Sequence, residues 1–179
     1  MGAHASNFPD NQALIDSLKE TSEVPSHVER VFRLVDRGFY SVDPNERIYS
    51  DSAWRAERLH LSSPGIYITV LCELDIRPGQ SVLNIGSGTG YLSTIFGLLL
   101  GSDSGDPDLL NFLRSSELNI ESPPVVRSGS SETSTLEYWP TYDRIYVGSE
   151  ISSRGQLEAI LRLLKVGGRL IAPVYDQVS

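Results

Sequence analysis

The sequence predicts an α/β fold in which a parallel sheet carries helices on both faces. A short apolar run at 82–85 is followed by a glycine-rich turn and then by an apolar helical stretch at 91–100. A strand, a glycine turn and a helix, in that order, begin a nucleotide-binding α/β unit. Later, strand-like runs at 142–148 and 169–174 flank a helical pattern. Strands that alternate with helices in this way form a parallel sheet.

Length and composition limit the possible classes of protein. The 179 residues fit one domain, which we place at 11–179 after an N-terminal tail at 1–10. Hydrophobic residues make up 40% of the chain, and the net charge of −8 argues against nucleic acid as the main partner. We find no run of 18 apolar residues, no secretory signal and no metal-ligand spacing among the three histidines. We therefore expect a cytoplasmic protein without a metal.

The first six residues carry a possible lipidation signal. Met1-Gly2-Ala3-His4-Ala5-Ser6 fits the N-myristoylation pattern, which places the acyl chain on Gly2. A single acyl chain gives only marginal and reversible membrane binding, and no polybasic patch follows to strengthen it. The pattern predicts a weak association with membranes.

Four helices are expected outside the central unit. We expect Asn11 to cap the first helix. Ser26 and Glu29 have the spacing of a capping box for the second helix, which Gly38 would end. The third helix should start at Ser63-Pro64, because proline is favoured in a first helical turn. The last would run from Ser152 or Ser153 to Gly167-Gly168. Between the second and third helices, 39–59 has an irregular pattern. Its aromatic side chains should pack it onto the domain, and lining a cleft is the alternative.

The glycine-rich turn Gly86-Ser87-Gly88-Thr89-Gly90 is the first candidate site. Glycines let the backbone approach a ligand without an intervening Cβ, and the next helix offers unpaired N–H groups. The GxGxG spacing fits a methyl-donor site better than the GxGxxG fingerprint of dinucleotide sites. An NAD-binding domain, or a tight turn without a ligand, are the alternatives.

Ser62 is the second candidate, because it lies just before the expected start of the third helix, where a hydroxyl can face a site. His60 is two residues away, and strand-like spacing would place both side chains on one face. No acidic partner is identifiable for a Ser–His–acid nucleophile. A serine that simply belongs to the turn is the alternative.

Several motifs occur in the order seen in protein-L-isoaspartate O-methyltransferases: HLSSP, LNIGSGTGYLS, YDRIYVGSE and LLKVGGRLIAPV. The resemblance covers roughly residues 11–176 and is closest to the branch called isoaspartate O-methyltransferase domain-containing proteins. In that branch asparagine replaces the usual acid of the glycine motif, DRG follows the second helix, and the N-terminus carries a myristoylation pattern. Asn84, Asp36-Arg37-Gly38 and Met1-Gly2 fit these three points.

The resemblance implies a Rossmann-like class I methyltransferase fold that binds S-adenosyl-L-methionine. It also implies transfer of a methyl group to isoaspartyl carboxylates in damaged proteins. The family's active-site serine corresponds to Ser62. The positions expected at the cofactor are Leu59, His60, Leu61, Tyr67, Asn84, Gly86, Ser87, Gly88, Thr89, Gly90, Gly129 and Ser130.

Two departures from the family pattern bear on activity. Residues 101–124 contain no β-branched run for the second strand with its ribose-binding acid, and the chain ends before the final strands. We therefore expect a sheet without these strands, an exposed edge, and weak or absent activity. The alternative function is a non-catalytic module that recognises damaged proteins. Longer members of the branch recruit ubiquitin-ligase subunits through a C-terminal segment, for which this chain has no room.

Overall fold

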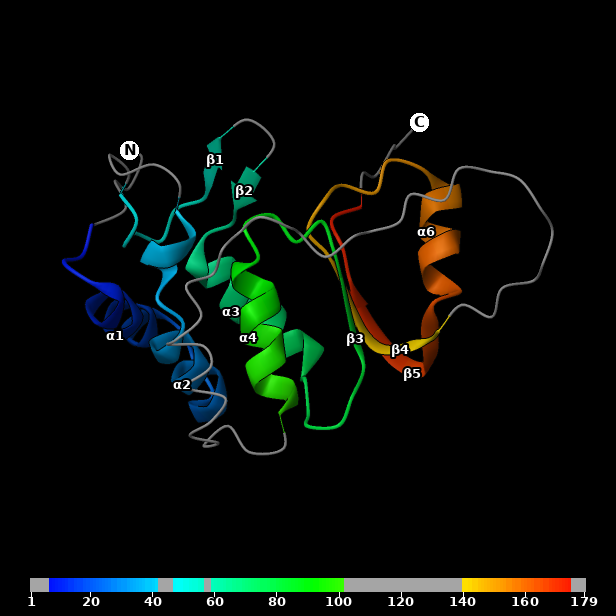
Figure 1. Ribbon diagram of the computed structural model, residues 1–179, viewed down its shortest axis with the longest axis horizontal. Coiled ribbons are helices and arrows are strands. Elements are labelled where there is room, and N and C mark those ends of the chain that lie inside the picture. Colours follow the sequence, from blue (N-terminus) through cyan, green and yellow to red (C-terminus); the bar gives the residue numbers. More distant parts are fainter. Residues whose placement is uncertain (1–6, 42–46, 57–58, 102–139, 175–179) are drawn as a thin grey trace.

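A parallel three-stranded sheet with helices on both faces forms the centre of the molecule (Figure 1). The computed structural model describes residues 7–41, 47–56, 59–101 and 140–174. Strands β3 (Val82–Ile85), β4 (Tyr142–Val147) and β5 (Leu164–Ile171) lie in the order β3-β4-β5. The predicted α/β fold is confirmed. The predicted loss of the second strand and of the closing strands falls on residues outside the described ranges.

Two layers of helices cover the sheet. On one side lie α1 (Asn11–Thr21), α2 (Ser26–Leu34), α3 (Pro64–Leu74) and α4 (Tyr91–Leu100), and α6 (Arg154–Leu161) covers the other face (Figure 1). A short 3₁₀ helix, η1 (Arg37–Tyr40), follows α2. The antiparallel pair β1 (Trp54–Ala56) and β2 (Leu59–Leu61) lies at the end of the molecule where β3 ends (Figure 1). This arrangement brings β2 close to the glycine turn.

The alternation of side chains along β4 divides the core in two. Tyr146 is buried in the larger cluster, with the side chains of α1 to α4. Its neighbours Ile145 and Val147 point to the opposite face and pack with Ile151 and with partly buried residues of α6. Because α6 has no buried residue of its own, the helical layer of α1 to α4 supplies most of the core.

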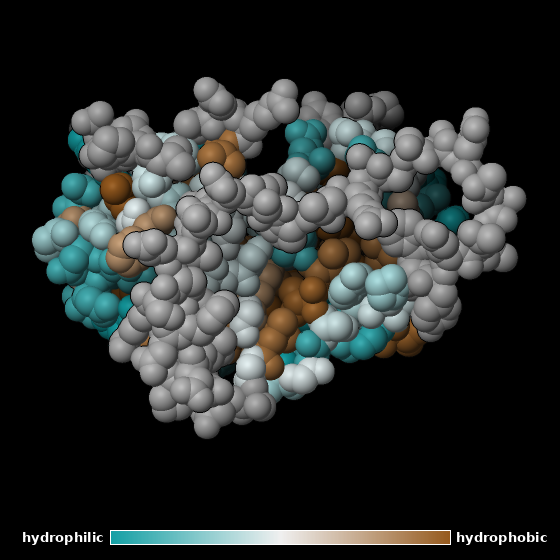
Figure 2. Space-filling view, in the orientation of Figure 1, coloured by the Kyte–Doolittle hydropathy of each residue, from teal (hydrophilic) through white to brown (hydrophobic). Residues whose placement is uncertain are grey.

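Apolar side chains are visible on the surface between α4 and α6 (Figure 2). This region lies over the β3 side of the sheet, and every residue of β3 is half-buried. Within the described ranges β3 forms one edge of the sheet and β5 the other.

The starts of the first two helices differ from prediction. The N-cap of α1 is Asp10, whose carboxylate accepts the Ala13 N–H at 2.9 Å. Asn11 is buried in the first turn instead, where its amide bonds the Phe32 carbonyl. The capping box is also wrong, because α2 follows Pro25 without a side-chain cap and the Glu29 carboxylate bonds Lys19 and Arg33.

Two predicted helix ends were also wrong. Helix α2 ends at Leu34, before Gly38, which belongs to η1. Helix α6 ends at Leu161, and Gly167-Gly168 lies inside β5 at an irregularity in its pairing with β4. Gly167 has a φ of +78°, and a Cβ on Gly168 would lie 2.9 Å from the Asp143 carbonyl oxygen. The glycines therefore serve a strand irregularity, which their sequence alone does not distinguish from a helix end.

The predicted starts of α3 and α6 are confirmed, whereas the last strand, predicted at 169–174, spans Leu164–Ile171. Helix α3 starts at Pro64 after Ser63, and α6 follows Ser153, whose hydroxyl accepts the Gln156 N–H. The irregular segment packs onto the domain through the buried rings of Tyr40 and Trp54, although it also contains η1 and β1.

Candidate functional site

The glycine turn between β3 and α4 is enclosed by two other backbone segments. Gly88 has a φ of +57° and faces the carbonyl oxygen of His60 so closely that a Cβ would clash with it. A Cβ on Gly86 would lie 3.3 Å from the backbone nitrogen and the hydroxyl of Ser149. The turn therefore lies between β2 and the segment that follows β4, at the carboxyl ends of parallel strands, where α/β proteins bind ligands.

One small pocket at this turn brings several of the predicted residues together. Its lining includes six of them, namely His60, Ser62, Tyr67, Asn84, Gly86 and Ser87. Its volume is about 30 Å³, so in this state it admits only a small group. Leu92, Tyr146 and Gly148 also line it and were missed. Tyr146 could have been found, because it lies beside Asn84 in the parallel register of two adjacent strands.

Ser62 lies between β2 and α3 with both backbone polar groups bound by side chains. Its N–H donates to Tyr67 Oη at 3.0 Å, and its carbonyl accepts from Arg37 Nη1 at 2.8 Å. The Ser62 hydroxyl has no hydrogen-bond partner among the residues that the structure describes. That hydroxyl is therefore available to a ligand in the pocket.

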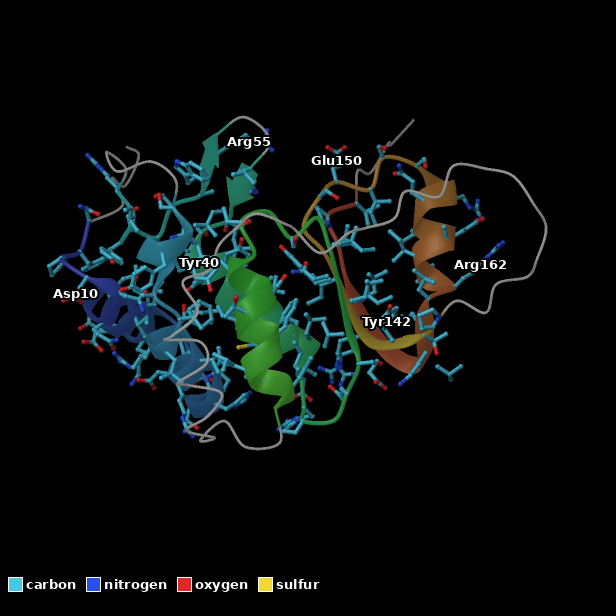
Figure 3. All side chains as sticks on the ribbon, in the orientation of Figure 1. Asp10, Tyr40, Arg55, Tyr142, Glu150 and Arg162 are labelled. Carbon is cyan, nitrogen blue, oxygen red and sulfur yellow. The ribbon has the colours of Figure 1, made fainter. Side chains whose placement is uncertain are left out.

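His60 presents a neutral ring at neutral pH. Burial lowers its pKa, and the positive charges of Arg55 and Arg37 lower it further. Arg55 lies opposite His60 in the β1–β2 pair and is labelled in Figure 3. Within the described ranges the imidazole forms no hydrogen bond, so no neighbouring side chain there orients the ring as a base.

Two buried oxygen atoms at the glycine turn lack hydrogen-bond partners in the described part of the chain. They are Asn84 Oδ1 and Thr89 Oγ1, while Asn84 Nδ2 donates to Ser93 Oγ at 2.8 Å. Because the Ser93 hydroxyl can donate or accept, either end of the Asn84 amide can take that bond, and the other end is left unpaired. A buried polar group without a partner costs about 1–3 kcal/mol. A bound ligand or an ordered water can supply the missing partners of such groups.

The other predicted residues lie elsewhere. Gly90 is the N-cap of α4, and Leu59 is exposed and does not line the pocket. Leu61 faces a different cavity. Gly129, Ser130 and Gly2 fall outside the described residues, so the structure does not test them.

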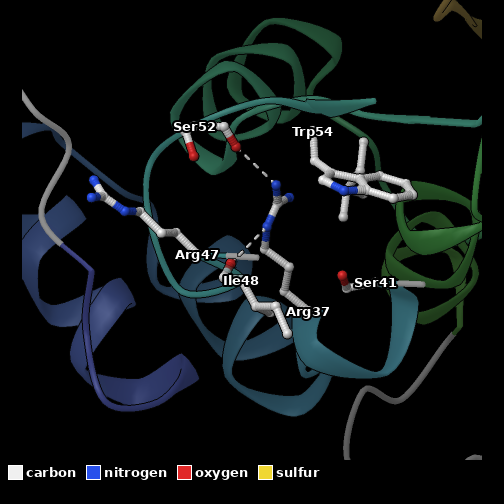
Figure 4. A pocket seen from close by; sticks show the side chains of 7 residues that line it. Arg37, Ser41, Arg47, Ile48, Ser52 and Trp54 are labelled. Carbon is white, nitrogen blue, oxygen red and sulfur yellow. Dashed lines mark hydrogen bonds between the residues drawn. The ribbon is translucent and has the colours of Figure 1, made fainter. Parts of the chain in front are cut away.

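The cavity that Leu61 lines is larger, about 320 Å³, and lies beside Arg37 (Figure 4). Its other lining residues are Ser41, Arg47, Ile48, Ser52 and Trp54. The Arg37 guanidinium donates to the carbonyls of Ile48 and Ser52 at 3.2 and 3.0 Å. Apart from Leu61, this larger cavity is lined by none of the predicted site residues and by no part of the glycine turn. We therefore place the functional site at the smaller pocket. Arg37 itself was missed as a site residue, although the DRG motif had singled it out.

In the described ranges, no three His, Cys, Asp or Glu side chains gather as a group that could hold a metal ion. None of the helices described is both long and apolar enough to cross a membrane.

The sequence and the fold both match known proteins. A model of the family described as protein-L-isoaspartate(D-aspartate) O-methyltransferase (PCMT) matches residues 9–179. Protein-L-isoaspartate O-methyltransferase 1 of Arabidopsis thaliana is 30% identical to the chain, over 94% of the chain and 79% of that relative. Protein-L-isoaspartate O-methyltransferase of Triticum aestivum is 29% identical to the chain, over 93% of the chain and 79% of that relative.

A solved structure agrees with these relatives. It is a protein-L-isoaspartate O-methyltransferase of Plasmodium falciparum in complex with S-adenosyl-L-homocysteine. The two folds superpose with a TM-score of 0.72 at 21% identity, over 96% of this chain and 87% of that one. The chain therefore has the class I methyltransferase fold that its motifs predicted, and it belongs to the protein-L-isoaspartate(D-aspartate) O-methyltransferase family.

Proposed function

We propose that the chain binds S-adenosyl-L-methionine at the glycine turn and transfers its methyl group to isoaspartyl carboxylates of damaged proteins. The observation that carries this proposal is the pair of unpartnered buried oxygens, Asn84 Oδ1 and Thr89 Oγ1, beside a pocket that also holds the free Ser62 hydroxyl. Family membership supports the reaction class, and the relatives named above are isoaspartate methyltransferases by name.

The donor set fits the methionine end of this cofactor. Asn84 Oδ1 is an acceptor suited to an ammonium group, and the N–H groups at the start of α4 suit a carboxylate. The glycines leave no Cβ between these groups and the ligand. Because the His60 ring is neutral, it adds no positive charge next to a positively charged cofactor.

The substrate group needs little activation. An isoaspartyl carboxylate is ionised at neutral pH and is itself the nucleophile. The bound cofactor supplies an electrophilic methyl group on its sulfonium. The chain's task is then to hold the carboxylate in line with that group and to exclude water. In this proposal the Ser62 hydroxyl donates a hydrogen bond to the carboxylate and orients it, and does not act as a nucleophile.

The first test is calorimetric titration of the purified chain with S-adenosyl-L-methionine, with Gly88→Asp as the control. A methyl-transfer assay then compares an isoaspartyl peptide with the same peptide carrying ordinary aspartate. We expect binding that Gly88→Asp abolishes, and transfer to the isoaspartyl peptide alone. Failure of the folded chain to bind the cofactor would overturn the proposal. Peptide binding without transfer would support the non-catalytic recognition module instead.

We also propose that Gly2 is myristoylated and that the chain is cytoplasmic with weak membrane association. The supporting observation is the Met1-Gly2 pattern, which lies outside the described residues. Intact-mass measurement on the protein expressed in eukaryotic cells tests it, with Gly2→Ala as the control. An N-terminal glycine found free or acetylated would rule the acylation out.

A further inference from the structure

Ser62 is held in place by side chains and not by a regular element. It lies after β2 ends at Leu61 and before the N-cap of α3 at Ser63. Its backbone N–H donates to Tyr67 Oη at 3.0 Å, and its carbonyl accepts from Arg37 Nη1 at 2.8 Å. The orientation of the serine therefore depends on these two side chains.

Arg37 is itself rigid. It is 2% exposed, and its guanidinium donates to the carbonyls of Ile48, Ser52 and Ser62. A planar guanidinium presents its donors at fixed angles, so three separate acceptors, two before β1 and one after β2, leave it one orientation. Two of these bonds are drawn in Figure 4.

Tyr67 is fixed from the opposite side. It is 6% exposed, and its ring lies 5.8 Å from that of Tyr91, centroid to centroid. Tyr91 is fully buried and contacts Phe32 edge-on at 6.1 Å. The hydroxyl that accepts from Ser62 is thus attached to an anchored aromatic cluster.

We propose that Tyr67 and Arg37 are positioning residues for methyl transfer, which hold the Ser62 backbone so that its hydroxyl lies at the pocket. The proposal rests on the proposed function. It gives Tyr67 a different role from the cofactor contact that the family resemblance implies, because the Tyr67 hydroxyl bonds the serine backbone.

Tyr67→Phe tests this most directly, because it keeps the ring and removes only the acceptor. Tyr40→Phe is the matched control. Tyr40 is 7% exposed, its ring lies 5.2 Å from the same Tyr91, and its hydroxyl donates to Thr94 Oγ1 and not to Ser62. Figure 3 shows Tyr40 in the helical layer beside α4.

We expect Tyr67→Phe to lower kcat on an isoaspartyl peptide about tenfold, with KM for S-adenosyl-L-methionine within about twofold of wild type. Tyr40→Phe should change neither constant. Equal losses in both variants would show a general loss of packing, and a raised KM with unchanged kcat would show a cofactor contact. Either result overturns the proposal.

Amide hydrogen exchange at Ser62, followed by NMR, tests the positioning without any activity. We expect exchange about tenfold faster in Tyr67→Phe and unchanged in Tyr40→Phe. If the wild-type chain transfers no methyl group, the proposed function fails while this measurement still decides the role of Tyr67. Unchanged exchange of the Ser62 amide in Tyr67→Phe would overturn the positioning role of Tyr67.

Arg37→Lys extends the test to the carbonyl side of Ser62. Lysine keeps the positive charge but cannot bond three separate carbonyls at fixed angles. We expect kcat to fall with KM for the cofactor unchanged. A wild-type kcat in Arg37→Lys would show that Arg37 is not a positioning residue. If Arg37→Lys does not fold, the Tyr67→Phe measurements decide the proposal.

Discussion

Gly88 faces the carbonyl oxygen of His60 with no room for a Cβ between them, so the glycine turn and strand β2 meet backbone to backbone. Ser62 follows that strand by one residue. Any side chain at position 88 would push the cofactor turn away from the serine.

Gly88→Ala should therefore weaken binding of S-adenosyl-L-methionine at least tenfold. The change adds a Cβ at a φ of +57° and against the His60 carbonyl, so we expect a loss of about 1–3 kcal/mol in unfolding free energy. Calorimetric titration and urea unfolding measure the two effects. The control is Gly97→Ala inside α4, where nothing lies within 4 Å of the added Cβ and stability should rise by up to about 1 kcal/mol. Unchanged cofactor affinity in Gly88→Ala would contradict the placement of the site.

Cofactor affinity should fall at acid pH through His60. Its pKa is lowered from the ordinary value near 6.5, first by burial and then by Arg55 and Arg37. The ring is therefore neutral above about pH 6.5 and gains its charge only below it, where it repels the positively charged cofactor. We expect a constant dissociation constant between pH 7 and 8 and a several-fold increase toward pH 5. His60→Gln should remove that increase, and a variant that keeps it would show that another group titrates.

Asp143 should make stability depend on acid pH. Lys165 Nζ lies 2.8 Å from its carboxylate, and the backbone N–H and hydroxyl of Ser81 donate to it as well. These bonds hold the pKa of Asp143 well below its usual range, Lys165 contributing most. The stabilisation is complete above the ordinary carboxyl pKa near 4 and is lost as the pH falls below it.

Thermal unfolding between pH 6 and 3 tests this dependence. Asp143→Asn should lower the melting temperature at pH 6 and flatten its decline toward pH 3. Glu158→Gln is the control, because the exposed pair of Glu158 with Arg154 on α6 should contribute little. Parallel curves for wild type and Asp143→Asn would contradict the assignment.

Arg144 should be among the most sensitive positions of the core. Its buried guanidinium donates to the carbonyls of Leu74, Asp75 and Asp143, which joins the end of α3 to β4. Arg144→Met leaves these carbonyls unpaired, and we expect a loss of about 2–3 kcal/mol in urea unfolding. Arg154→Met, at a side chain that is 91% exposed, should stay within about 0.5 kcal/mol. Equal effects of the two changes would show that the Arg144 bonds contribute little.

The sequence predicted the central unit well because its pattern is local. A strand, a glycine turn and a helix follow one another within 19 residues, 82–100, and each is specified by its own residues. Ser63 and Pro64 likewise specify the start of α3, because proline is favoured in the first turn of a helix. The helix caps were less predictable. Glu29 of α2 forms an ion pair with Lys19 of α1, so its carboxylate does not cap the start of α2.

The support of the site depends on contacts between distant segments, which periodicity does not encode. Arg37 reaches Ser62 across 25 positions, and Gly88 meets His60 across 28. The family motifs identified most of the pocket residues, but they gave no indication that the hydroxyl of Tyr67 bonds the serine backbone. The bond of Tyr67 to Ser62 became visible only with the relative placement of β2 and α3.

If Ser62 has the proposed role, a ligand in the cavity beside Arg37 should inhibit the protein without entering the pocket at the glycine turn. A small carboxylate or sulfonate compound lodged in that space would compete with backbone carbonyls for the guanidinium. Withdrawing the guanidinium from Ser62 would loosen the serine without occupying the pocket at the glycine turn. Such a compound would be non-competitive toward the methyl donor, an advantage where many enzymes share that donor.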